Sequence, residues 1–218
     1  MSNTALPPRL EELSLLIAGR LGLHFPAARL RTMENAFGQA ARAAGFASTS
    51  TFVDALLRPS PSDVLFDALV RELTVGETYF FREPAVFTAI TEHFLPEWSR
   101  RWSHRMALPR FWSAGCCSGE EAYTLAIALE RGGFPAPERA EILASDLNPH
   151  FLRLAREGIY RPWSFRGAPD WCGRVISAPW MANVWRSAAT SGAPCVSNAS
   201  TWLVRVSPRR TTAPRPST

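Results

Sequence analysis

The sequence predicts an α/β chain, in which a small helical domain precedes an incomplete domain of alternating strands and helices. Apolar residues recur at helical spacing through residues 8–75, and from Arg110 onward short apolar runs alternate with helical patterns. Of the 218 residues, 46% are hydrophobic and 20% charged, which is the composition of a globular protein that buries a core.

The first domain, residues 8–75, is expected to be built from helices alone. Apolar residues follow the helical period over residues 10–23, 26–44, 51–57 and 63–73. The sequence SPSD at 60–63 interrupts the pattern and offers Ser or Asp as an N-cap for the last of these helices.

The second domain, residues 76–166, reads as strand, helix, strand, helix. RFWSAG at 110–115 is a short apolar strand that ends at a glycine, and residues 118–133 form a helix closed by a glycine pair. EILASD at 141–146 is the second strand, and a helix follows from residue 149. This order predicts parallel strands joined by a right-handed crossover.

A ligand is expected where the first strand turns into the helix. Ligands bind outside the carboxyl ends of parallel strands, where a residue without Cβ lets the chain turn and an acid after the next strand accepts hydrogen bonds from ribose hydroxyls. Gly115 and Asp146 fit these two roles. The turn is not GxGxxG, which argues against a dinucleotide. From the residues alone, a nucleotide-like ligand and a plain structural turn stay equally open.

Two residue pairs flank this turn. Glu120 and Glu121 fall in the first helical turn, where the macrodipole favours carboxylates; this accounts for one of them, and the other is expected to face the ligand. Cys116 and Cys117 have no base beside them in sequence, which favours small-residue filler in a tight loop over a nucleophile. The other two cysteines lie far downstream, so no metal spacing or disulfide framework is visible.

Between the two domains lies TVGETYFFREP, residues 74–84. Its aromatic residues fit a helix start that anchors the core. An Arg beside aromatic residues is equally suited to hold a carboxylate in bidentate fashion, which makes Arg82 a candidate. The residues alone leave both interpretations open.

Three segments, taken together, resemble the CheR family of chemotaxis methyltransferases. They are TVGETYFFRE, FWSAGCCSGEEAYTLAIAL and ILASDLNPHFLRLAREGIY, which stand in that family's order and at its intervals. The resemblance covers residues 8–166 and implies an incomplete Rossmann-like SAM-dependent methyltransferase domain. It also implies S-adenosyl-L-methionine as cofactor, and methyl transfer to glutamate side chains in the cytoplasmic helical region of methyl-accepting chemotaxis receptors.

The same resemblance implies the site residues by position. Arg82 and Tyr79 are expected at the catalytic centre. Cofactor contacts are expected from Gly76, Thr78, Arg82, Gly115, Glu120, Glu121 and Asp146. At Gly76 some members have an Asn that touches the cofactor, so this contact is expected to differ. Because a substrate carboxylate is already ionised at neutral pH, the reaction needs neither metal nor strong base, and Arg82 is expected to hold that carboxylate.

Residues 167–218 form a tail of different character. The chain has no Lys, and from Arg161 onward eight Arg face a single acid, so the basic charge belongs to the tail. The tail shows neither helical periodicity nor clean strand alternation, and the family's later strands are absent from it. We interpret it as a frameshifted or truncated tail foreign to the fold. The sheet is then expected to stop at about two strands, and the chain alone to have little or no activity.

Two other functional classes remain. A non-catalytic regulatory or docking module of a chemotaxis-like system would bind the cofactor without turnover. A nucleic-acid binder is disfavoured because the Arg residues form no regular stripe. The N-terminus lacks a signal-peptide pattern, and no apolar stretch approaches the ~18 residues of a membrane span, so a cytoplasmic protein without membrane insertion or nucleic-acid partner is expected.

Overall fold

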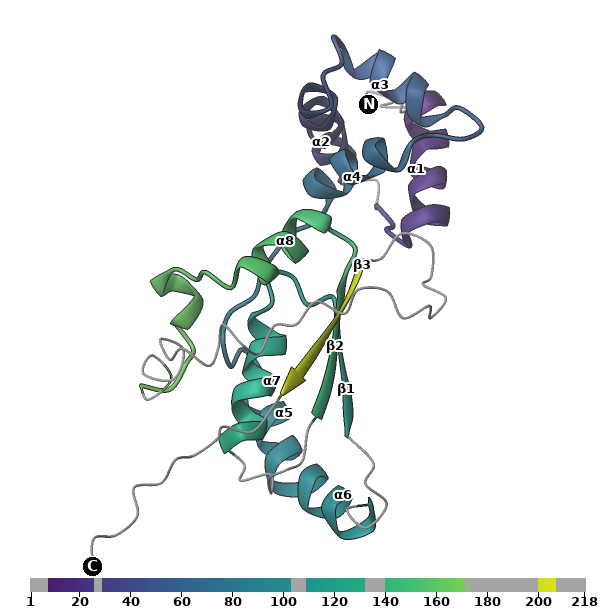
Figure 1. The fold of residues 1–218 in the computed structure, drawn as a ribbon. Coiled ribbons are helices and arrows are strands. Elements are labelled where there is room, and N and C mark those ends of the chain that lie inside the picture. Colours follow the sequence, from purple (N-terminus) through teal and green to yellow (C-terminus); the bar gives the residue numbers. More distant parts are fainter. Residues whose placement is uncertain are drawn as a thin grey trace, which may run out of the picture. The chain divides into compact units, whose positions relative to one another are not determined.

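The computed structural model describes residues 8–25, 29–102, 109–131, 140–170, 172 and 200–206 (Figure 1). The chain divides into two compact units. The first comprises residues 1–76 with 147–150 and 195–200, and the second comprises residues 77–146, 151–194 and 201–218. Each unit has its own hydrophobic core, and each is described by itself.

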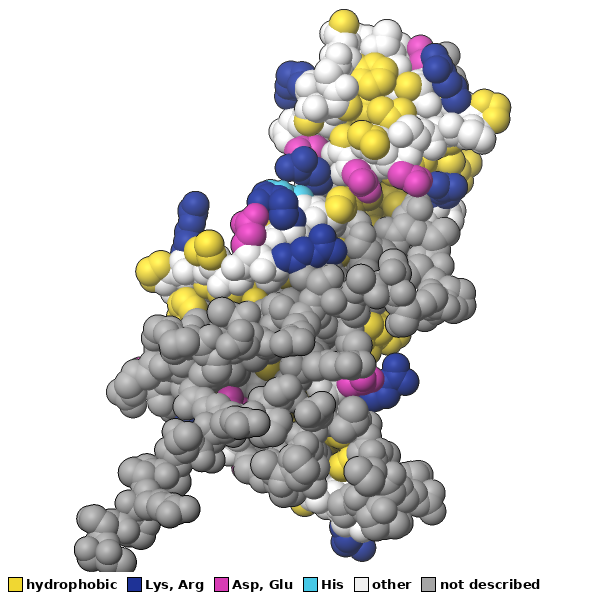
Figure 2. Space-filling view, viewed as in Figure 1, with side chains coloured by type: hydrophobic (Ala, Val, Ile, Leu, Met, Phe, Trp, Pro, Cys, Tyr) yellow, Lys and Arg dark blue, Asp and Glu magenta, His cyan; other side chains and the backbone are white. Residues whose placement is uncertain are grey.

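The first unit is helical over its described N-terminal part. Its helices are α1 (Pro8–Leu21), α2 (Leu30–Ala43), α3 (Thr49–Leu56) and α4 (Asp63–Leu73). Apolar residues at helical spacing place one face of each helix in a shared core, in which Phe37, Phe52 and Leu69 are fully buried. On the face of this unit seen in Figure 2, basic and acidic side chains are interspersed, so that face carries no patch of one sign.

Serine side chains begin two of these helices. Ser48 Oγ accepts a hydrogen bond from the Thr51 N–H (3.2 Å), and Ser62 Oγ accepts one from the Val64 N–H (3.3 Å). Each bond satisfies a backbone donor that has no partner inside the helix. The predicted break between helices at 60–63 is therefore present, and Ser62 rather than Asp63 is the N-cap of α4.

The second unit carries the strands. In chain order it contains α5 (Pro84–Ala89), the π-helix η2 (Ile90–Phe94), α6 (Leu95–Trp102), β1 (Arg110–Ala114), α7 (Glu120–Arg131) and β2 (Ala140–Asp146). It continues with most of α8 (Pro149–Glu157), then the 3-10 helix η4 (Pro162–Phe165) and most of β3 (Ser200–Val206). The predicted strand, helix, strand, helix order is observed.

Parallel pairing of the first two strands is confirmed. β1 and β2 pair in register, with Phe111 opposite Ile142 and Ser113 opposite Ala144. Ile142 and Ala144 on β2 are buried in the core to which α7 also contributes. Trp112, which lies on β1 between the partners of these two residues, is 67% exposed. One face of this strand pair therefore packs on α7, as the period of two along a strand requires.

The expectation that the sheet stops at two strands is wrong. β3, from the predicted tail, joins the sheet beside β2, in the order β1-β2-β3. Its sequence, STWLVRV, is rich in β-branched and aromatic residues, which favour strands. This short run was missed because the segments around it carry no strand pattern. Whether the tail belongs to the original fold stays a prediction.

Among the described residues, no helix is long and apolar enough to span a membrane.

Candidate functional site

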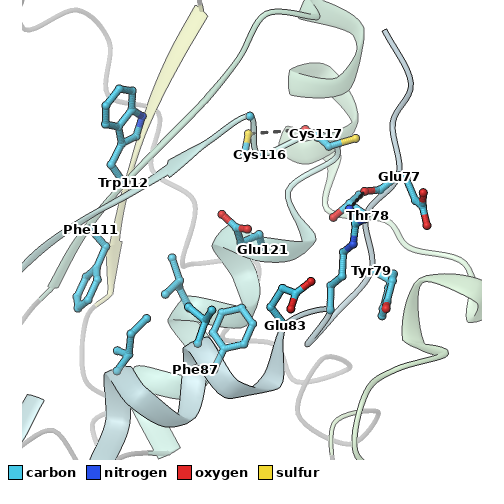
Figure 3. A pocket seen from close by; sticks show the side chains of 15 residues that line it. Glu77, Thr78, Tyr79, Glu83, Phe87, Phe111, Trp112, Cys116, Cys117 and Glu121 are labelled. Atoms are coloured by element: carbon cyan, nitrogen blue, oxygen red, sulfur yellow. Dashed lines mark hydrogen bonds between the residues drawn. The ribbon is translucent and has the colours of Figure 1, made fainter. Parts of the chain in front are cut away.

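A cavity of about 320 Å³ opens in the second unit (Figure 3). Its volume lies at the lower end of the range for small-molecule pockets, about 300–1,000 Å³. The lining comes from the 77–83 segment, from α5 and η2, from β1 and the turn after it, and from α7. The lining residues are Glu77, Thr78, Tyr79, Arg82, Glu83, Val86, Phe87, Ile90, Phe111, Trp112, Gly115, Cys116, Cys117, Glu121 and Leu125.

The turn after β1 is held by backbone bonds to β2. The N–H groups of Gly115 and Cys116 both donate to Ser145 O, at 2.8 and 2.9 Å. Gly115 has φ +77°, a conformation that costs glycine little. Apart from Gly115 and its two chain neighbours, no heavy atom lies within 4 Å of the position that a Cβ would take. The missing side chain therefore leaves open space on the cavity wall.

A second glycine of the turn serves packing instead. Gly119 has φ +95°, and a Cβ there would lie 2.9 Å from Ala155 Cβ. It lets the start of α7 approach α8 closely.

Asp146 lies next to the cavity lining but does not belong to it. Its Oδ2 accepts a hydrogen bond from the Cys117 N–H (2.8 Å), and Cys117 does line the cavity. The carboxylate at the end of β2 thus holds the turn after β1. Cys117 has φ +51°, so this bond fixes a backbone conformation that non-glycine residues seldom adopt.

The two acids at the start of α7 have different surroundings. Glu120 is 3% exposed and accepts hydrogen bonds from Ser118 Oγ (2.7 Å) and Ser164 Oγ (3.0 Å), which ties the turn to η4. Glu121 is exposed, lines the cavity, and accepts a bond from the buried Ser113 Oγ (2.6 Å). Glu120 thus has structural partners, whereas Glu121 faces the cavity. The macrodipole as the reason for one of the two acids stays a prediction.

The 77–83 segment brings an exposed guanidinium to the cavity. Arg82 lies between two anchors: its Nη1 donates to Glu77 O (2.5 Å), and the preceding Phe81 N–H donates to Thr124 Oγ1 on α7 (3.2 Å). Phe81 has φ +59°, and its buried ring packs edge-on against Phe87 at 5.7 Å. The aromatic residues of this segment anchor a core, as one interpretation expected, and Arg82 lines the cavity. That Arg82 holds a carboxylate stays a prediction.

The cysteine pair is buried, which agrees with a filler role. Burial raises the pKa of the Cys116 thiol to about 12, with a contribution from the Asp146 charge, and raises that of Cys117 to about 11. Both thiols are therefore protonated at neutral pH and are weak nucleophiles. In the described part of the chain, no group of three or more His, Cys, Asp or Glu is placed to hold a metal ion.

The lining suits a cationic ligand with an apolar part. Its charged residues are three carboxylates, from Glu77, Glu83 and Glu121, and one guanidinium, from Arg82. In Figure 3 the Glu121 and Glu83 carboxylates point into the space between Phe111 and the 77–79 segment. Apolar side chains complete the wall. S-adenosylmethionine combines a sulfonium cation with an aromatic base and a methyl group, so the residues present fit it.

Five of the predicted site residues line the cavity together: Thr78, Tyr79, Arg82, Gly115 and Glu121. Glu120 and Asp146 instead support the turn, and Gly76 lies in the first unit, outside the lining. The individual roles stay predictions.

Sequence reasoning missed most of the apolar wall, which comes from Val86, Phe87, Ile90, Phe111, Trp112 and Leu125. It also missed the acids Glu77 and Glu83. Glu77 and Glu83 stand in the same motif as Arg82, and this position could have identified them as site residues.

Comparison with known proteins indicates a methyltransferase family. Residues 76–174 match the family described as CheR methyltransferase, SAM binding domain. The chain is 30% identical over 160 residues to a chemotaxis protein methyltransferase of Borreliella burgdorferi, covering 69% of this chain and 55% of that protein. It is 37% identical over 117 residues to chemotaxis protein methyltransferase 2 of Vibrio cholerae, covering 52% of this chain and 39% of that protein.

The match to the chemotaxis protein methyltransferase of Escherichia coli is 38% identical over 96 residues, covering 44% of this chain and 31% of that protein. The chain thus spans about a third to about half of the length of these relatives. All the residues that line the cavity lie within the matched segment. The family match indicates S-adenosyl-L-methionine as the cofactor. Residues 76–174 of this chain are a SAM-binding domain of the CheR methyltransferase family.

Proposed function

We propose that this chain transfers a methyl group from S-adenosylmethionine to glutamate side chains in the cytoplasmic helical region of methyl-accepting chemotaxis receptors. The observation that carries the proposal is that one guanidinium, Arg82, shares a cavity with three carboxylates and an apolar wall. Such a cavity can accept a cationic methyl donor and an anionic acceptor side by side. The names of the relatives, which are chemotaxis protein methyltransferases, support the same class of reaction.

On the cofactor side, Gly115 and Glu121 would hold S-adenosylmethionine, together with the apolar wall. The bound cofactor supplies a methyl carbon attached to a positively charged sulfur. Glu121 places a carboxylate at the cavity, and its bond to Ser113 Oγ fixes the direction of that carboxylate. The open space at Gly115 lets a ligand approach the backbone of the turn.

On the substrate side, Arg82 would bind the carboxylate of the acceptor glutamate. A glutamate carboxyl group has a pKa near ~4.3, so it is ionised and nucleophilic at neutral pH and needs no general base. The fork of the guanidinium can hold one carboxylate oxygen and orient the other toward the methyl group. Tyr79 completes this side of the cavity.

The first test is calorimetric titration of the purified chain with S-adenosylhomocysteine, beside an Asp146→Ala variant. We expect binding to the wild-type chain and loss of binding in the variant, because Asp146 holds the turn that carries Cys117. An absence of binding to the wild-type chain would contradict the cofactor assignment.

The second test is methyl transfer from radiolabelled S-adenosylmethionine to a receptor cytoplasmic fragment. Arg82→Ala is expected to lower kcat/KM by about 10–100-fold, the value of one charge-assisted interaction, while leaving the affinity for S-adenosylhomocysteine within about twofold. Arg82→Lys keeps the charge but not the fork of the guanidinium, so its kcat/KM should lie between those of the wild-type chain and Arg82→Ala. A receptor fragment without acceptor glutamates is the control.

The same assay tests the expectation that this chain alone has little or no activity. Methyl transfer at a rate typical of an intact enzyme would contradict that expectation. Cofactor binding without transfer to any fragment would reject the catalytic proposal for this chain and favour a regulatory or docking module.

A further inference from the structure

The segment that follows α8 packs directly on the residues that carry the cavity wall. The Phe80 N–H donates to Ser164 O (2.9 Å), and the Phe80 ring stacks on Phe165 with centroids 4.8 Å and planes 4° apart. The Tyr160 ring meets Phe80 edge-on at 4.9 Å. Residues 160–165 therefore fix the backbone next to Tyr79.

Arg166 extends this packing to the Tyr79 ring itself. Its guanidinium carbon lies 3.9 Å from the centroid of the Tyr79 ring and 4.7 Å from that of Trp163, and its Nη1 donates to Trp163 O (3.0 Å). Gly167 touches the same ring, because a Cβ there would lie 2.5 Å from Tyr79 Cε2. The Arg82 guanidinium carbon is 6.0 Å from the ring centroid. Tyr79 is thus the meeting point of two guanidinium groups and a glycine.

We propose that Arg166 is a positioning residue, which holds the Tyr79 ring against the cavity and thereby sets the rate of methyl transfer. The inference rests on the proposed function for its effect on transfer. Arg166 is not among the described residues that line the cavity, whereas Tyr79 is, so the effect must pass through the ring. A tyrosine on a cavity wall has several rotamers available, and a cation against its face selects one before the substrate arrives.

The chain offers a direct spectroscopic test, because it contains only three tyrosines. Full-length protein labelled with 3-fluorotyrosine is examined by fluorine NMR, and the Tyr79 signal is assigned by its loss in Tyr79→Phe. Arg166→Ala is expected to shift and broaden the Tyr79 signal. The signals of Tyr123 and Tyr160, which pack in the core, should keep their positions and report that the variant is folded.

Arg161→Ala is the matched control, since Arg161 is an exposed arginine of the same segment. It should leave all three signals in place. An unchanged Tyr79 signal in Arg166→Ala would overturn the proposal.

The kinetic test is a double-mutant cycle on methyl transfer. Arg166→Ala is expected to lower kcat about threefold to tenfold, the range of one cation–π contact, with the dissociation constant of S-adenosylhomocysteine unchanged. In a Tyr79→Ala background the same change should have no further effect. Gly167→Ala, which pushes the ring while keeping Arg166, should reproduce the loss of kcat.

The outcomes separate this inference from the proposed function. A full effect of Arg166→Ala in the Tyr79→Ala background, or a changed cofactor affinity, would reject a role through Tyr79. If the wild-type chain transfers no methyl groups, the proposed function fails, and the fluorine spectrum by itself decides whether Arg166 holds Tyr79.

Discussion

At the residue scale, the two adjacent carboxylates at the start of α7 have different surroundings. Glu120 is buried between two serine hydroxyls, whereas Glu121 is exposed at the cavity. Sequence reasoning anticipated this division, because a helix N-terminus explains only one acid, but it could not assign the roles. Adjacent positions on a helix point about 100° apart, and which one meets a cavity depends on how the helix packs.

The two acids should therefore respond differently to substitution. Glu120→Ala is expected to lower the free energy of unfolding by about 1–3 kcal/mol, because the Ser118 and Ser164 hydroxyls lose their acceptor. Urea denaturation followed by circular dichroism measures this change. A stability equal to that of the wild-type chain would contradict the structural role.

Glu121→Gln keeps an oxygen for Ser113 but removes the negative charge. We expect the affinity for S-adenosylmethionine to fall about tenfold, with a smaller loss for S-adenosylhomocysteine, which is uncharged at sulfur. Calorimetric titration with both ligands measures the difference. Equal losses for the two ligands would place Glu121 at the cofactor hydroxyls instead of the sulfonium.

Burial of Cys116 and Cys117 should slow the reaction of their thiols at alkaline pH. Burial disfavours the thiolate, so the pKa values of about 12 for Cys116 and about 11 for Cys117 lie above the ordinary 9.0. At pH 9, iodoacetamide should therefore alkylate both residues about tenfold or more slowly in the native chain than in urea, where the thiolate forms near its usual pH. Mass spectrometry of the labelled peptides resolves the two sites. Equal rates in native and unfolded protein would show that these thiols are not buried.

At the element scale, regular periodicity was readable and irregular segments were not. β1, α7, β2 and α8 follow from alternating apolar runs and helical spacing, and the observed bounds differ from the predicted ones mainly at the ends. α5, η2 and α6 were not predicted, because a π-helix inserted between two short helices breaks the 3.6-residue period. That failure hid Val86, Phe87 and Ile90, so three of the six apolar residues in the cavity wall could not be found from the sequence.

The N-cap of α4 is an element whose contribution can be measured alone. Ser62→Ala removes the acceptor of the Val64 N–H and is expected to destabilise the first unit by about 1 kcal/mol. Ser62→Asp, which restores an acceptor, should recover most of the loss. Hydrogen exchange of the α4 amides measures both variants. Unchanged exchange in Ser62→Ala would mean that the cap contributes nothing.

At the scale of the whole molecule, the described residues form two cores, and the cavity belongs to the unit that holds one of them. The core of the second unit contains Phe80, Tyr123 and Ile142, whereas that of the first contains Phe37 and Phe52. The sequence indicated this division through the change from purely helical periodicity to alternating strands and helices. It could not indicate that β3 joins the sheet, since pairing depends on contacts between distant segments.

Cofactor binding should therefore stabilise the two cores unequally. S-adenosylhomocysteine at about 100 times its dissociation constant should raise the unfolding free energy of the second unit by about 2.7 kcal/mol. Hydrogen exchange monitored by mass spectrometry should show added protection in α7 and β2, with α2 unchanged. Equal protection of α2 would indicate that the two units unfold together.

Phe81 combines a strained backbone with a buried ring. A left-handed backbone at a non-glycine residue costs about 1–3 kcal/mol, yet the ring of Phe81 is buried and the next residue is Arg82. Glycine would relieve the backbone but would remove the ring from the core. A change of Phe81 to glycine would therefore exchange backbone strain for the lost contact with Phe87, so the relief of strain next to Arg82 is offset by a loss of core packing.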